Sequence, residues 1–284
     1  MMIELEGGYI KKGTYFVKNE TNLNGLFVQN IVFIQSNDLN QNIEALLEEK
    51  NINTIRLTDD YKYDNLDFLK EYDLSFIKSI DINSNYVNNI EGLYELKNIE
   101  RIGADNKNID FTKFPKIRAF TGELSDFSYE SISDISSMEK LRLLKFKHND
   151  LSIFSNNLKI NELMLGYSKI TSLKGLEKFL CIENIELFHN RRLSSLEGII
   201  TNHSRLKYFR SYSTPNLFKI DEYLRKLPQL KLLQLGSKKV DSFNFLDNLL
   251  KLELLDIHNL ITNVEDNNKE PLINALKRTG SKIW

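Results

Sequence analysis

The run Leu141-x-x-Leu144-x-Phe146 is followed by two runs of the same form, Ile160-x-x-Leu163-x-Leu165 and Ile182-x-x-Ile185-x-Leu187. Each run places apolar residues three and five positions after its first apolar residue. The runs begin 19 and 22 residues apart, at positions 141, 160 and 182. A fixed period of about 20 residues is typical of stacked units, because one such unit is too small to bury its own apolar face.

The same spacing continues in both directions from this stretch. The gaps between the first apolar positions range from 18 to 25 residues. These positions are Ile52, Ile77, Ile99, Ile117, Leu141, Ile160, Ile182, Leu206, Leu230 and Leu252. The alternation that follows each position predicts a short strand with one buried side. Spacings of three and four in the later half of each unit, as at Leu173, Leu176 and Phe179, predict helical or 3₁₀ turns.

From Ile52 to the C-terminus, this spacing resembles the leucine-rich repeat family. It looks most like the bacterial short-repeat branch, with internalin-like or phosphatase-regulator-like units. The resemblance implies an α/β fold: a leucine-rich repeat solenoid with a curved parallel sheet on the concave face. Short helices or 3₁₀ turns would lie on the convex face, and caps would cover both ends of the apolar core.

Two features depart from the family pattern. The family places an asparagine three residues after the second strand leucine, where its amide bonds backbone groups of the turn. Asn85, Asn149 and Asn190 match that offset, and other residue types stand there elsewhere. The repeats that start at Ile99 and Ile117 have Ala104 and Gly122 where a large apolar residue is expected. We therefore expect irregular turns, and a thinner or kinked solenoid at these two repeats.

The chain divides into three parts. They are residues 1–51, an N-terminal cap of strands plus one helix; residues 52–257, about ten leucine-rich repeats; and residues 258–284, a C-terminal cap. In the first part, Asn24-Gly25 is a favoured hairpin turn pair, and residues 40–50 carry the apolar stripe of an amphipathic helix. In the last part, a helix is expected from Pro271, and Trp284 is expected to cover the final apolar layer.

Composition disfavours several classes of partner and location. The net charge is −1, from 38 basic and 39 acidic residues, which disfavours nucleic acid as a partner. The single cysteine, Cys181, cannot form an internal disulfide and is expected to be a small buried hydrophobe. The N-terminal residues lack the apolar segment of a signal peptide, and no apolar run is long enough to span a membrane. The sequence therefore predicts a cytoplasmic protein that is not inserted in a membrane.

No catalytic motif rises above chance. The chain lacks a Walker or Rossmann glycine loop, H-E-x-x-H, G-x-S-x-G and C-x-x-C. We therefore expect neither an enzyme nor a metal or other cofactor. The alternative is an enzyme or enzyme subunit whose site lies in the atypical N-terminal segment or in the irregular region 99–139. A deep pocket lined with titratable groups would favour that alternative, and a shallow aromatic surface would favour a binding module.

The residues beside the strand leucines define the surface expected to bind a partner. Aromatic, methionine and arginine side chains gather in the middle and later repeats, and such residues are enriched in the energetic centre of protein interfaces. The candidate partner-binding residues are Lys145, Lys147, Met164, Tyr167, Glu186, Phe188, His189, Tyr208, Arg210 and Tyr212. The alternative is that these aromatic side chains lean on one another and only cover the sheet. The pair Arg191-Arg192 is interpreted as solvated loop charge.

These patterns favour a non-enzymatic module that binds a protein partner through the concave face, as a monomer or weak oligomer. A specific version of this hypothesis is a bacterial immunity or inhibitor protein that blocks a toxin or an enzyme. It rests on fold analogy alone. Self-association through an exposed sheet edge or a cap is a third possibility.

Overall fold

The structure is a computed structural model. It describes residues 2–5, 9–12, 15–21, 28–48, 52–154, 156–236, 239–240, 242–258, 261–262 and 269–281. The chain forms two compact units, residues 1–132 and 133–284, which are described separately below. The predicted boundaries at residues 51 and 257 stay a prediction.

The N-terminal unit begins with antiparallel strands and continues with parallel ones. The antiparallel strands are β1 (Met2–Leu5), β2 (Tyr9–Lys12), β3 (Tyr15–Thr21) and β4 (Val28–Ile34). The parallel strands that continue from β4 are β5 (Thr54–Leu57), β6 (Ser79–Ile82), β7 (Arg101–Lys107) and β8 (Ala119–Leu124). The helices are α1 (Leu39–Glu48) and α2 (Asp126–Ser133), with 3₁₀ turns at Ser36–Asp38, Asp67–Lys70, Glu91–Glu95 and Phe111–Lys113.

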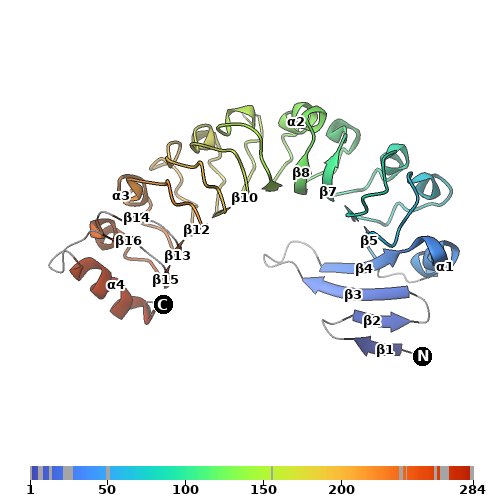
Figure 1. The fold of residues 1–284 in the computed structure, drawn as a ribbon, viewed down its shortest axis with the longest axis horizontal. Coiled ribbons are helices and arrows are strands. Elements are labelled where there is room, and N and C mark those ends of the chain that lie inside the picture. Colours follow the sequence, from blue (N-terminus) through green and yellow to red (C-terminus); the bar gives the residue numbers. More distant parts are fainter. Residues whose placement is uncertain are drawn as a thin grey trace. The chain divides into compact units, whose positions relative to one another are not determined.

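The C-terminal unit is built around a parallel sheet whose neighbouring strands follow one another along the chain (Figure 1). Its strands are β9 (Lys140–Leu144), β10 (Glu162–Gly166), β11 (Asn184–Phe188), β12 (Tyr208–Tyr212), β13 (Leu232–Gly236) and β15 (Leu254–His258). A small parallel pair joins β14 (Lys239–Val240) to β16 (Ile261–Thr262). The helices are α3 (Ile220–Leu224) and α4 (Glu270–Thr279), with 3₁₀ turns at Ser152–Phe154, Leu176–Lys178 and Asn244–Asn248.

Strand register aligns the apolar positions of successive repeats in columns. Leu163 of β10 pairs with Ile185 of β11, which pairs with Phe209 of β12, and all three side chains are fully buried. Each lies three residues after a buried first apolar position, as the sequence predicts. The prediction of stacked repeats with one buried strand face is therefore confirmed within each unit.

The register predicted for the Leu141 run is wrong by three residues. Strand β9 pairs Leu141 and Leu143 with Leu163 and Leu165, so Met138 is the first apolar position of this repeat. Met138 is fully buried. The run contains two apolar pairs with period-two spacing, Leu141/Leu143 and Leu144/Phe146. Strand β9 places the first pair in the buried column.

The predicted irregularity at the Ala104 and Gly122 repeats is confirmed. Strand β7 carries a register shift between Asp105 and Lys107 where it pairs with β8. Gly122 lies so close to β7 that a Cβ atom there would be 2.0 Å from the carbonyl oxygen of Ala104, and its φ is +135°. Such a close approach of two backbones requires glycine. The next element is the helix α2 instead of a 3₁₀ turn.

Only one of the three predicted asparagines bonds backbone groups of the preceding repeat through its side chain, whereas the Asn85 side chain donates to the Asp59 carboxylate at 3.1 Å. The Asn190 side chain is fully buried, donates to the Leu165 carbonyl at 2.8 Å and accepts from the Ser168 N–H at 2.9 Å. Asn85 and Asn149 are exposed, so their assignment to this position was wrong. For Asn149 the error follows from the misplaced register of β9.

Replacing Asn190 by alanine leaves a buried N–H and a buried carbonyl without partners. We expect Asn190→Ala to lower the free energy of unfolding by about 2–4 kcal/mol, measured by urea denaturation. Asn149→Ala is the matched control because its side chain is exposed, and we expect almost no change. Equal destabilisation by both changes would contradict the assignment of the ladder position to Asn190.

The helices predicted at the two ends of the chain are confirmed. The N-terminal helix is α1, and the C-terminal one is α4, with Pro271 in its first turn and Gly280 after its end at a φ of +66°. Helix α4 packs against the last repeat, where it contacts β15 and the 3₁₀ turn Asn244–Asn248. Asn24-Gly25 and Trp284 lie outside the described residues.

His203 ties two repeats of the C-terminal unit together. Its ring is fully buried, accepts from the Ile200 N–H at 3.3 Å through Nδ1, and contacts the Leu176 carbonyl at 3.0 Å through Nε2. A carbonyl only accepts, so Nε2 carries the proton and the ring is neutral. Burial lowers the pKa of His203 below its ordinary value of 6.5.

A lowered pKa for His203 makes stability depend on pH. Below about pH 6.5 the unfolded chain binds a proton that the folded ring resists, so the free energy of unfolding falls as pH decreases. We expect urea unfolding of the native chain to show this loss between pH 7.5 and 5.5. The His203→Gln variant should be less stable at pH 7.5 and show a smaller pH slope. An unchanged slope in the variant would contradict the role of His203.

Candidate functional site

The strands of the C-terminal unit carry three columns of residues opposite the buried leucines, which we call the open face. Each column contains one residue from each strand, in register. The first column is Lys140, Glu162, Asn184, Tyr208, Leu232 and Leu254; the middle column is Arg142, Met164, Glu186, Arg210, Gln234 and Asp256; the third is Leu144, Gly166, Phe188, Tyr212, Gly236 and His258.

A buried carboxylate anchors the β9–β10 part of the open face. Glu162 lies 3.2 Å from the Lys140 ammonium and accepts from the Arg142 guanidinium at 2.6 Å. The Glu162 side chain is 4% exposed and that of Lys140 is 7% exposed. Arg142 also approaches Glu186 on β11, at 3.7 Å. Charges this deeply buried are stable only while they remain paired.

Replacing Glu162 by glutamine removes the charge that balances the buried Lys140. We expect Glu162→Gln to lower the free energy of unfolding by about 3 kcal/mol, measured by urea denaturation. Glu253→Gln is a matched control because Glu253 also pairs with a lysine, Lys231, but is 66% exposed. The control should leave the melting temperature unchanged, and a similar loss in both variants would contradict the importance of burial.

Neutral polar side chains hold Arg210 in place. Its Nε donates to the Gln234 side chain at 2.7 Å, and Gln234 in turn donates to Asp256 at 2.8 Å. Arg210 forms no ion pair with a carboxylate among the described residues, although Glu186 is its register partner on β11. Its guanidinium is therefore held by hydrogen bonds to neutral side chains. Beside it, burial, and then the charge of Asp256, raises the pKa of Tyr212, so this phenol remains neutral.

An apolar row runs along the first column at the β12, β13 and β15 strands. Tyr208 pairs with Leu232, and Leu232 pairs with Leu254, in register. Tyr208 is 37% exposed, Leu254 is 42% exposed, and Leu232 is partly exposed. Adjacent strands are about 4.8 Å apart, so these three side chains form one continuous strip.

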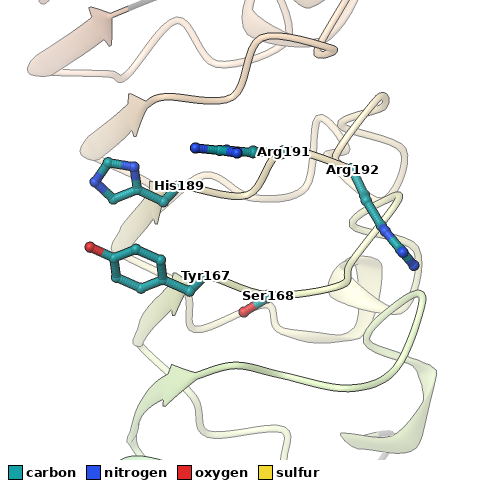
Figure 2. Close-up of a pocket in the computed structure, with 5 residues that line it drawn as sticks. All are labelled: Tyr167, Ser168, His189, Arg191 and Arg192. Carbon is teal, nitrogen blue, oxygen red and sulfur yellow. The ribbon is translucent and has the colours of Figure 1, made fainter.

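Aromatic side chains cover the end of β10 and β11. The Phe188 ring lies on Gly166, where a Cβ atom would be 2.2 Å from the ring. Tyr167 meets Phe188 edge-on at 5.5 Å. Tyr167 also stacks on His189 at 4.7 Å (Figure 2). Tyr167 and His189 follow the strands with φ values of +54° and +55°. These aromatics do lean on one another, yet Tyr167 remains 58% exposed.

The structure separates the predicted partner-binding residues into three groups. On the open face, Glu186, Phe188, Tyr208, Arg210 and Tyr212 are at least partly exposed. Met164 lies in the middle column but is only 5% exposed, because Arg142 and Glu186 flank it. Tyr167 and His189 lie just beyond the strands.

Lys145 and Lys147 were predicted to lie on a strand, and this is wrong. Strand β9 ends at Leu144, so both lysines belong to the following turn. Lys145 adopts a φ of +51°, like Tyr167 and His189 at the same position of the next two repeats. The cause is the register error in the Leu141 run. The residue that occupies the middle column of β9 is Arg142.

Several residues of the open face were missed. Lys140 and Arg142 were missed because the register of the Leu141 run was wrong. Glu162 was assigned to this face but was not chosen as a partner-binding residue. Leu232 and Leu254 precede strand leucines, so each belongs to a leucine pair, Leu232-Leu233 and Leu254-Leu255. Two adjacent leucines on a one-sided strand require one of them to face outward, and this signal could have identified both.

The N-terminal unit has a comparable ion cluster on its own sheet. Asp81 on β6 pairs with Arg56 at 2.9 Å and with Arg101 at 2.7 Å, and its side chain is 5% exposed. Gly103 on β7 leaves room for the carboxylate, because a Cβ atom there would be 2.1 Å from Asp81 Oδ1. The three charges sum to +1, and each of the three groups has an ion-pair partner within the cluster.

The chain matches solved bacterial repeat structures. One is an internalin (inlF) from Listeria monocytogenes, with a TM-score of 0.63 and 15% identity over 85% of this chain and 69% of the internalin. The chain has the leucine-rich repeat fold. A second leucine-rich repeat match is an internalin C2 (inlC2) from Listeria monocytogenes, with a TM-score of 0.49 and 14% identity over 75% of this chain and 83% of that chain. No protein-family model and no curated protein sequence matches the chain.

Among the described residues, no group of three or more His, Cys, Asp or Glu side chains is arranged to hold a metal ion. None of the helices in the described part of the chain is long and apolar enough to cross a lipid bilayer.

Proposed function

We propose that the chain is a non-enzymatic module that binds a protein partner on the open face of its C-terminal unit. This is the face that the sequence predicts to be concave. In this role the chain acts in the cytoplasm, needs no cofactor and is a monomer or weak oligomer. A specific version is a bacterial immunity or inhibitor protein that blocks a toxin or an enzyme.

The observation that carries the proposal is the surface around β12. The apolar strip of Tyr208, Leu232 and Leu254 adjoins Arg210, whose guanidinium is held in place but has no carboxylate partner among the described residues. An exposed apolar strip beside a preorganised arginine is typical of interface centres, because both lose little entropy on binding. The hydrogen bonds from Arg210 to Gln234 and from Gln234 to Asp256 further reduce the side-chain entropy that Arg210 loses on binding.

We expect the triple change Phe188→Ala, Tyr208→Ala and Arg210→Ala to weaken capture of the native partner at least tenfold. Interface aromatics and arginines commonly contribute about 2 kcal/mol or more each, and 1.4 kcal/mol is a tenfold change in affinity. The measurement is affinity capture from lysate of the source cell, followed by quantitative mass spectrometry. The variant should keep its native melting temperature.

A matched control removes the same residue types away from the open face. Tyr86, Phe218 and Arg225 are exposed and lie outside the strands. Capture by the Tyr86→Ala, Phe218→Ala, Arg225→Ala variant should equal that of the native chain. Unchanged capture by the open-face variant, or equal loss in both variants, would refute the proposed surface. Size-exclusion chromatography of both variants separates partner binding from self-association.

A further inference from the structure

Three consecutive turns stack at the carboxyl ends of β9, β10 and β11. They are residues 145–149, 167–171 and 189–193, and backbone hydrogen bonds join them, such as Lys169 N–H to the Phe146 carbonyl at 2.8 Å. The register of the strands fixes which side chains align. Lys147, Lys169 and Arg191 each lie six residues after the paired positions 141, 163 and 185. They therefore form a column, with neighbours about 5 Å apart at the backbone.

These turns carry lysine and arginine side chains and no carboxylate. They contain five such basic residues and no aspartate or glutamate, although the whole chain has a net charge of −1. The basic residues are Lys145, Lys147, Lys169, Arg191 and Arg192, and all five are exposed. Lys169, Arg191 and Arg192 form no ion pair with any described carboxylate. Like charges held this close repel one another, and a bound anion would relieve the repulsion.

A small pocket lies at the β11 end of these turns. Its volume is about 280 Å³, and it is lined by Tyr167, Ser168, His189, Arg191 and Arg192. The stacked rings of Tyr167 and His189 form one wall, and Arg191 extends toward His189 (Figure 2). Ser168 is occupied by the Phe146 N–H and the Gly166 carbonyl. Arg191 is the cationic side chain that extends toward the Tyr167–His189 wall, whereas the Arg192 side chain points away from that wall (Figure 2). A guanidinium group suits an oxyanion.

We propose that these three turns, the basic edge, bind a carboxylate-rich peptide segment of a protein partner, with one carboxylate in the pocket beside Arg191. This inference rests on the proposed function, because it assigns the chemistry of part of the partner. The remaining carboxylates of the segment lie along the column of Lys147 and Lys169. Phe188 joins the basic edge to the open face through its contact with Tyr167, so one partner can reach both.

The dimensions of the basic edge favour a peptide carboxylate over nucleic acid. The pocket volume of about 280 Å³ lies at the lower end of the range for small-molecule sites, roughly 300–1,000 Å³, and is enough for one acidic head group. The column spans about 10 Å over three repeats, far shorter than the contact of a protein that tracks a nucleic-acid backbone.

The test measures binding of a fluorescent deca-glutamate peptide to the full chain by fluorescence anisotropy at low and at physiological salt. We expect deca-glutamate to bind, deca-glutamine not to bind, and an oligothymidylate of ten nucleotides to bind more weakly than deca-glutamate. The double change Arg191→Gln and Arg192→Gln should weaken deca-glutamate binding at least tenfold. Both arginines are exposed, and the variant should keep the native melting temperature.

A control variant with the same net charge separates a local site from general attraction. Arg225→Gln with Lys251→Gln removes two exposed positive charges outside the basic edge, and it should bind deca-glutamate like the native chain. Equal loss in both variants, no binding by the native chain, or tighter binding of the oligothymidylate would overturn the inference. The titration needs no native partner. If deca-glutamate does not bind but the open-face variant captures less partner, the basic-edge inference is refuted and the proposed function stands. If the open-face variant captures as much partner as the native chain does, the proposed function is refuted.

Discussion

Parallel pairing between consecutive repeats is the constraint on which the rest of each unit depends. A single strand such as β10 has unpaired backbone groups on both edges and only two or three buried apolar side chains. Its hydrogen bonds and its buried face are completed by β9 and β11. The side chains that tie the turns, such as Asn190 and Ser168, bond the backbone of the preceding repeat as well. Each repeat is therefore stable only between its neighbours.

This pairing also determines which polar side chains meet. Residues at one offset of successive repeats stand about 5 Å apart, so a charge at that offset must find its partner 20 to 25 residues along the chain. Asp81 meets Arg56 and Arg101 in this way, and Glu162 meets Arg142. Where complementary charges alternate, they form ion pairs across the strands. Where the cross-strand partner is neutral, as Gln234 is for Arg210, a hydrogen bond takes the place of the ion pair.

The two surfaces of the C-terminal unit differ in how their residues are held. On the open face, strand geometry and cross-strand bonds fix the side chains before any partner arrives. At the basic edge, positive φ values direct Tyr167 and His189 out of the sheet, and the charged side chains beside them are exposed. The glycine at position 166 links the two surfaces, because it leaves the space that the Phe188 ring occupies next to Tyr167.

The sequence by itself determined the repeated fold, the alternating buried strands, the terminal helices and the irregular pair of repeats. Each of these follows from local spacing and from residues such as Gly122 and Pro271. It also placed Phe188, Tyr208, Arg210 and Tyr212 on the open face. Only the tertiary structure decided the register of β9, since the pairs Leu141/Leu143 and Leu144/Phe146 alternate equally well.

Only the tertiary structure, too, identified the cross-repeat partners of Glu162 and Asn190 and the alignment of Lys147, Lys169 and Arg191. The physical reason is that these contacts join residues about one repeat apart, and a slip of a few residues in any one strand changes every pair it makes.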